Sequence, residues 1–123
     1  MEHSVKIVRV YDSEKRLPNE YRVLVDRLWP RGFAKGTIDY DEWAKDIAPS
    51  PELRKWYGHL PARFEEFSSR YRNELTRDPA STIITRLARL AREKQLILLT
   101  ATRDIDHSGA TVLKEVVEQH ALG

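Results

Sequence analysis

The sequence predicts one small α/β domain over residues 1–123, built as three layers with a short, mostly parallel sheet and helices on both faces. Two observations carry this prediction. Residues 21–28 and 95–101 each contain a continuous apolar run, typical of strands buried on both faces, so Leu24 and Leu98 should be almost fully buried. Segments of helical periodicity separate the two runs, and such a connection normally pairs its strands in parallel. The length suits a single hydrophobic core.

The first strand is expected at residues 5–10, where apolar and polar residues alternate as on a strand with one buried face. Turn-forming residues separate it from the second strand, residues 21–28. That strand should end near Pro30 and Gly32, because proline cannot donate to a sheet ladder and glycine adopts backbone angles that other residues avoid.

A long loop follows over residues 29–49. Loops of this length in compact domains are usually functional or contain a short element of their own. We expect such an element at residues 41–47. Trp29 and Trp43 should pack against each other or against the next helix, and thereby hold the loop in place.

Cap residues and apolar stripes predict four helices after this loop. The first helix has a serine cap followed by proline at its first position, and the third begins with an aspartate–proline pair. The second carries an apolar stripe at three- and four-residue spacing. The helix signals are, in chain order, Ser50-Pro51 to Gly58, Pro61, Asp78-Pro79, and Asp106 or Ser108.

Composition and local patterns exclude several functional classes. The chain has no cysteine, which excludes disulfides, thiolate zinc sites and cysteine nucleophiles. The longest apolar run, residues 96–99, is too short to span a membrane, and the N-terminus lacks an apolar signal region, so we expect a cytoplasmic protein without a membrane partner. The histidines lack metal-ligand spacing and no glycine-rich phosphate loop occurs, so neither a metal nor a cofactor is predicted.

The charge distribution gives limited support for nucleic-acid binding. Lysine and arginine number 21 against 19 aspartates and glutamates, a formal net charge of +2, and the two signs are interspersed along the chain. Arginine outnumbers lysine, which suits bidentate contacts to carboxylate or phosphate but is equally explained by a compositional bias.

Chemistry-bearing residues follow both apolar runs. Asp26, Arg27 and Arg31 come after the first run, and Thr100 ends the second. Since the carboxyl ends of parallel strands share one edge of the sheet, where ligands bind in open α/β folds, we expect these side chains to lie together. Arg27 and Arg31, beside a helix N-terminus, would attract an anion. The alternative is that each arginine pairs with a nearby acid; the candidates are Asp26, Asp46 and Asp104.

His107 and Asp26 are the candidates for catalysis. His107 precedes the last helix, whose dipole favours a neutral imidazole that can accept a proton; alternatively, it only orders its loop. Asp26 could move a proton or orient the arginines. Trp29, Thr100 and Ser108 are further ligand-binding candidates, although a helix cap also explains Ser108 and a plug of the loop against the core also explains Trp29.

Four segments resemble the YeaO-like family of bacterial and archaeal proteins, a domain family of unknown function: residues 21–32, 48–59, 67–75 and 100–113. The resemblance covers nearly the whole chain and implies a small α/β domain, but it supplies no established activity. Family members often carry asparagine after the histidine of the last motif, where this chain has Ser108. A ligand contact made by that asparagine would differ here.

The leading hypothesis is a pocket at the strand carboxyl ends for an anionic small molecule, phosphorylated or nucleotide-like. If the protein is an enzyme, which the sequence leaves open, hydrolysis or group transfer is the favoured class. The alternative is a non-enzymatic regulatory or nucleic-acid-binding module that uses arginines on helix faces, although interspersed glutamates interrupt that basic surface. A third option is a homodimer whose arginine cluster is an ion-pair network; the oligomeric state is not predicted.

Overall fold

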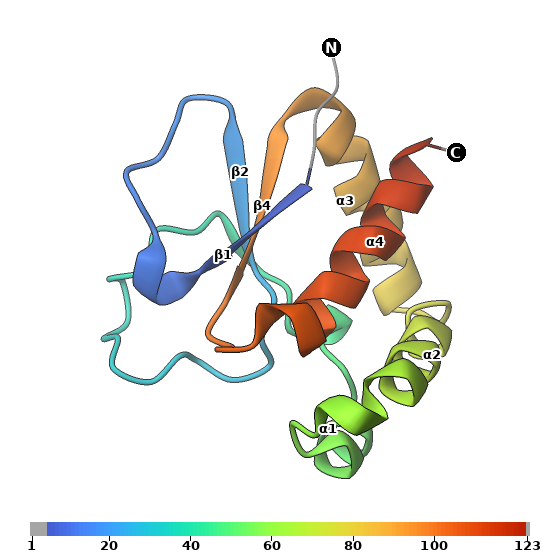
Figure 1. Cartoon of the computed structure of the whole chain (residues 1–123). Helices are drawn as coiled ribbons and strands as arrows, with labels where there is room; N and C mark the ends of the chain where they lie inside the picture. The colour runs from blue at the N-terminus through green and yellow to red at the C-terminus, as the bar shows by residue number, and fades with distance from the viewer. Residues whose placement is uncertain (1–4, 123) are drawn as a thin grey trace.

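The computed structural model describes residues 5–122, which form an α/β domain around one four-stranded sheet. The strand order is β1-β4-β2-β3 and every neighbouring pair is parallel, so the predicted α/β class, the parallel sheet and the pairing of the two apolar strands are confirmed. Leu24 and Leu98 are fully buried, as expected. The strands are β1 (Val5–Arg9), β2 (Glu20–Leu24), β3 (Glu42–Trp43) and β4 (Gln95–Thr100) (Figure 1).

β2 ends four residues earlier than the sequence suggests, and a side chain explains why. The ladder between β2 and β4 runs to Leu24 opposite Leu99. One residue beyond Thr100, the backbone N–H of Ala101 donates to the carboxylate of Asp26 instead of a backbone carbonyl. The ladder therefore stops where a polar side chain takes over a backbone donor.

The helices and short 3-10 turns follow the predicted starts closely. The hydroxyl of Ser50 accepts a hydrogen bond from the N–H of Leu53 at 3.1 Å, which is the predicted cap. Ser108 precedes the last helix, but its hydroxyl donates to the carbonyl of Ile105. None of the helices within residues 5–122 is long and apolar enough to cross a membrane. The helices are α1 (Pro51–Tyr57), α2 (Phe64–Glu74), α3 (Ala80–Glu93) and α4 (Gly109–Leu122), and the 3-10 turns are η1 (Val10–Asp12), η2 (Lys45–Ile47), η3 (Pro61–Arg63) and η4 (Ile105–His107).

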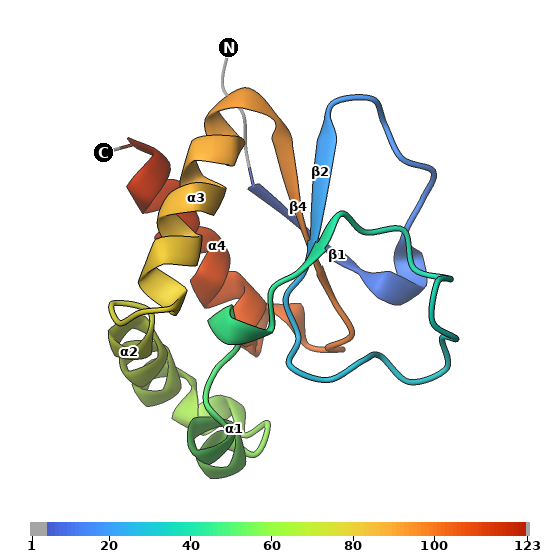
Figure 2. The ribbon, with the colours of Figure 1, turned by 180° about the vertical axis from the view of Figure 1, so that it is seen from behind.

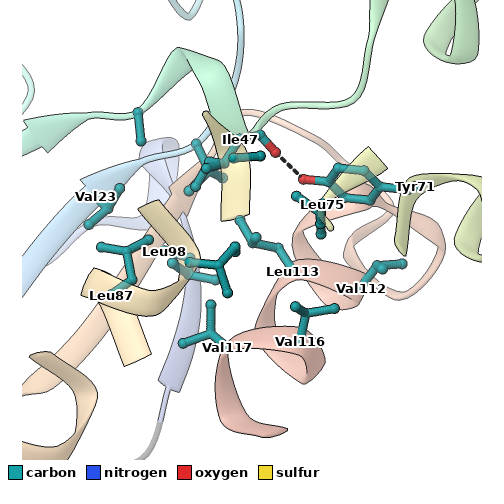
Figure 3. Close-up of a cluster of buried hydrophobic side chains, with 14 of the residues drawn as sticks. Val23, Ile47, Tyr71, Leu75, Leu87, Leu98, Val112, Leu113, Val116 and Val117 are labelled. Atoms are coloured by element: carbon teal, nitrogen blue, oxygen red, sulfur yellow. Dashed lines mark hydrogen bonds between the residues drawn. The ribbon is translucent and has the colours of Figure 1, made fainter. Parts of the chain in front are cut away.

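The larger core lies between the sheet and the helices, which gather on one side of it (Figures 1 and 2). Val23 and Leu98 from the sheet pack with Leu87 of α3 and with Val117 of α4 (Figure 3). At the end of this core, the buried hydroxyl of Tyr71 donates to the carbonyl of Ile47. This bond ties α2 to the turn that follows β3.

The opposite face of the sheet is covered by a loop, where the sequence led us to expect a second layer of helix. Leu24, Ile97 and Leu99 form a second core with aromatic side chains of the segment 25–43. An apolar run shows that both faces of a strand are buried, but not what buries them. The covering side chains are Trp29, Phe33, Ile38, Tyr40 and Trp43.

The expected short element lies inside this covering segment. β3 and η2 fall within residues 41–47, and β3 pairs with β2. The rings of Trp29 and Trp43 meet edge to face with centroids 5.5 Å apart, which confirms the predicted contact. The loop therefore packs on the second face of the sheet through its side chains, and its residues 28–31 border the carboxyl ends of the strands.

Candidate functional site

A cleft of about 730 Å³ opens at the carboxyl ends of β2 and β4, with α1 and the start of α4 on its other side. The parallel pairing brings together side chains far apart in the chain, as the sequence predicted. The cleft is lined by all seven of the proposed site residues: Asp26, Arg27, Trp29, Arg31, Thr100, His107 and Ser108. Their placement is settled by the fold, whereas their roles remain predictions.

Asp26 joins the ends of the two central strands. Its carboxylate accepts one hydrogen bond from the hydroxyl of Thr100 and one from the N–H of Ala101, both at 2.7 Å. Burial raises the pKa of Asp26 above its ordinary value, although these two bonds and the positive charge of Arg54 oppose that shift. Asp26 thus forms no ion pair with the arginines beside it within residues 5–122.

Among residues 5–122, the side chain of Arg27 makes hydrogen bonds to backbone oxygens only. Its Nη2 donates to the carbonyls of Ala48 and Pro49, each at the long distance of 3.3 Å. Its Nε is buried and has no hydrogen-bond partner among residues 5–122. A buried donor without a partner costs about 1–3 kcal/mol, so the described residues leave the hydrogen-bonding capacity of this guanidinium incompletely used.

The alternative that the arginines belong to an ion-pair network has no support among the described residues. Neither Arg27 nor Arg31 lies within ion-pair distance of a carboxylate in residues 5–122. Of the three candidate acids, Asp26 bonds to Thr100 and Ala101, Asp104 contacts His107, and Asp46 pairs with neither arginine.

Two further cations, Arg54 and Lys55 of α1, line the cleft and were missed in the sequence. They share one side of α1 with Pro51, because residues three and four positions apart neighbour each other on a helix. That spacing was readable in the sequence, but the direction of the helix was not. Among the described residues, the cleft is lined by four lysines and arginines and by one carboxylate, Asp26.

A carboxylate of α2 fixes the direction of α1. Glu74 accepts hydrogen bonds from the N–H of Ser50 at 2.9 Å and from its hydroxyl at 2.6 Å. Ser50 is also the cap of α1. The contact between α2 and this cap therefore holds the start of α1 in place, while the buried side chains of Leu53 and Tyr57 turn the other side of the helix away from the core.

His107 is tied to its surroundings through three contacts. Its Nδ1 lies 2.8 Å from Oδ2 of Asp104, and its ring meets Phe64 edge to face at 5.5 Å. Its carbonyl accepts a hydrogen bond of 2.5 Å from the hydroxyl of Tyr57, and burial raises the pKa of that phenol. Nε2 is the ring nitrogen left for a ligand or a proton. These contacts agree with a loop-ordering role and leave proton transfer as a prediction.

The remaining candidates have structural partners. The hydroxyl of Thr100 donates a hydrogen bond to the carboxylate of Asp26. The hydroxyl of Ser108, a buried residue, donates to the carbonyl of Ile105. The indole N–H of Trp29 donates to the carbonyl of Phe33 at 2.7 Å. Trp29 therefore plugs the loop against the second core, which was the simpler of its two interpretations.

Comparison with known proteins places the chain in a family. The family model described as "Inactive DUF488-N3 subclade" matches residues 4–122. Uncharacterized protein Rv3073c of Mycobacterium tuberculosis is 43% identical over 117 residues, which are 94% of this chain and 95% of that protein. Uncharacterized protein YeaO of Escherichia coli is 37% identical over 112 residues, covering 91% and 95% of the two chains. No solved structure matches significantly. The resemblance to YeaO-like proteins is thus confirmed, and the chain belongs to the DUF488-N3i family.

Proposed function

We propose that this protein binds a small anionic molecule, of the phosphate-ester class, in the cleft at the carboxyl ends of β2 and β4. The observation that carries the proposal is Arg27, which lines the cleft and has no carboxylate within ion-pair distance and no hydrogen-bond partner for its Nε among residues 5–122. A guanidinium matches the paired oxygens of phosphate and carboxylate groups. Arg31, Arg54 and Lys55 add positive charge around the same cleft.

The proposal is a binding function rather than hydrolysis or group transfer. The family description contains the word "inactive", and this favours a non-catalytic role for its members. Asp26 and His107, the candidates for moving a proton, are already engaged by neighbouring groups.

A small molecule is favoured over a nucleic acid by the state of the arginines on the helix faces. Arg70 pairs with Glu66, Arg72 with Glu115 and Arg86 with Glu42. A continuous basic surface for a phosphate backbone is interrupted wherever such pairs form. Four cations without an ion-pair partner among residues 5–122, by contrast, line one concave site of small-molecule size.

Calorimetric titration tests the proposal with inorganic phosphate and two phosphate monoesters, one carrying a sugar and one an alkyl chain. A charge-assisted hydrogen bond contributes roughly 1.5–3 kcal/mol, so Arg27→Ala should weaken binding by about tenfold to more than a hundredfold. Arg54→Ala, an exposed substitution on α1, should weaken it less. The matched control is Arg72→Ala, which removes an arginine outside the cleft and should leave the affinity unchanged.

Two results would overturn the anion site. One is that the parent protein binds none of the three compounds at millimolar concentration. The other is that Arg72→Ala weakens binding as much as Arg27→Ala and Arg54→Ala do, because the effect would then be one of net charge. If Arg27→Ala does not fold, Arg54→Ala against Arg72→Ala still decides between these outcomes.

A further inference from the structure

We propose that the ligand carries hydroxyl groups next to its anionic group, as phosphate monoesters of sugars and polyols do, and that Asp26 selects for them. This inference rests on the proposed anion site. It concerns the one group in the cleft whose charge is opposite to that of the surrounding cations.

Asp26 has unused capacity to accept hydrogen bonds. An ionised carboxylate offers about four lone-pair sites on its two oxygens. One oxygen accepts from Thr100 and the other from Ala101, so each oxygen retains a site. Asp26 is half-buried and lines the cleft, and a donor on a bound molecule can therefore use these sites.

Asp26 also discriminates by its charge. It lines the same cleft as Arg27, so its negative charge is part of the surroundings of an anion bound in that cleft. Inorganic phosphate at neutral pH offers only the one or two hydroxyl groups on the phosphorus itself, and its charge is repelled by the carboxylate. A hydroxyl group on the ligand donates a hydrogen bond to the carboxylate, and this bond offsets the repulsion between the carboxylate and the anion. Selectivity of this kind needs both the attraction and the repulsion.

The size of the cleft agrees with a ligand larger than phosphate itself. At about 730 Å³ it falls among small-molecule sites, which typically measure roughly 300–1,000 Å³. The arginines and Lys55 occupy part of the lining, and Asp26 with Thr102 provides polar groups elsewhere. A hydroxylated carbon chain attached to the phosphate would fill the space beside Asp26.

The test compares ribose 5-phosphate with pentyl phosphate, two five-carbon monoesters of the same charge, by calorimetric titration. The wild-type protein should bind the sugar phosphate at least tenfold more tightly. The alkyl chain gains more from apolar contact, so such a preference cannot arise from hydrophobicity. Asp26→Asn should reduce the preference to about threefold or less, and should leave affinity for pentyl phosphate unchanged or raised. Asp46→Asn, the same substitution at an exposed site outside the cleft, should keep the preference of the parent.

The outcomes separate this inference from the function on which it rests. Equal affinity of the wild-type protein for both monoesters refutes selection by hydroxyl groups but leaves the anion site standing. Binding of neither monoester refutes the anion site itself. A preference that survives Asp26→Asn unchanged assigns the selection to another residue and overturns the role of Asp26. If that variant does not fold, the wild-type comparison decides whether the ligand class is correct.

Discussion

Replacing Leu98 by alanine tests the placement of β4 at the centre of the sheet. Leu98 is fully buried and is paired with Ile7 of β1 on one side and Val23 of β2 on the other. Its side chain faces the larger core, where Leu87 of α3 and Val117 of α4 pack around it. The residues around Leu98 therefore belong to several different elements, and they cannot all shift to fill the cavity that the alanine would leave.

Leucine-to-alanine changes in cores cost about 2–5 kcal/mol, from lost burial plus the cavity that remains. Because the surroundings of Leu98 collapse poorly, we expect the upper half of that range, about 3.5–5 kcal/mol. A urea titration followed by circular dichroism measures the loss as a lower midpoint at constant slope. Leu17→Ala, the same change at a side chain that is 63% exposed, should alter stability by less than about 0.5 kcal/mol. A loss below about 0.5 kcal/mol for Leu98→Ala would show that β4 is not central.

Two other substitutions probe the loop and a surface ion pair. Trp43→Phe removes the hydrogen bond of 2.6 Å from the indole to the carbonyl of Asp26, and should cost about 1–2 kcal/mol in a urea titration; stability equal to that of the parent would mean that the loop is loosely held. Glu42 is held by Arg86 and Tyr21, and its pKa is lowered, mainly by the hydrogen bonds from Arg86. The stabilisation from this carboxylate is complete above its ordinary pKa of 4.5 and is lost as pH falls through the lowered value. Glu42→Gln should therefore be less stable than the parent at pH 7, with a difference that shrinks below pH 4.5; a constant difference across thermal melts from pH 3 to 7 would contradict the linkage.

The strand positions were predictable because burial leaves a direct trace in the sequence. The apolar runs around Leu24 and Leu98 identified β2 and β4, and their parallel pairing then placed Asp26 beside Thr100. The cover of the second face was not predictable in the same way. Aromatic residues such as Trp29 and Tyr40, dispersed along an irregular segment, have no periodicity that marks them as a layer.

The cations of α1 show a second limit of prediction from the sequence. Local sequence signals located the helix, from Ser50 to Gly58, but its place beside the cleft depends on distant contacts such as that of Ser50 with Glu74, which is 24 residues away. A long-range contact of this kind leaves no local pattern. Arg54 and Lys55 could therefore be assigned to the cleft only in three dimensions.

The loop over the second face both covers the apolar side of the sheet and contributes residues to the cleft. Within residues 26–40, one backbone–backbone hydrogen bond forms with partners in the described chain, from Thr37 to Ala34. Local opening of this segment should therefore cost less than global unfolding, and its amides should exchange with solvent early. The same opening would uncover Leu24, Ile97 and Leu99 and displace Arg31 from the cleft. If the cleft binds an anion as we propose, opening of the loop would remove the binding surface and expose an apolar face of the sheet together, so a bound ligand should also reduce aggregation.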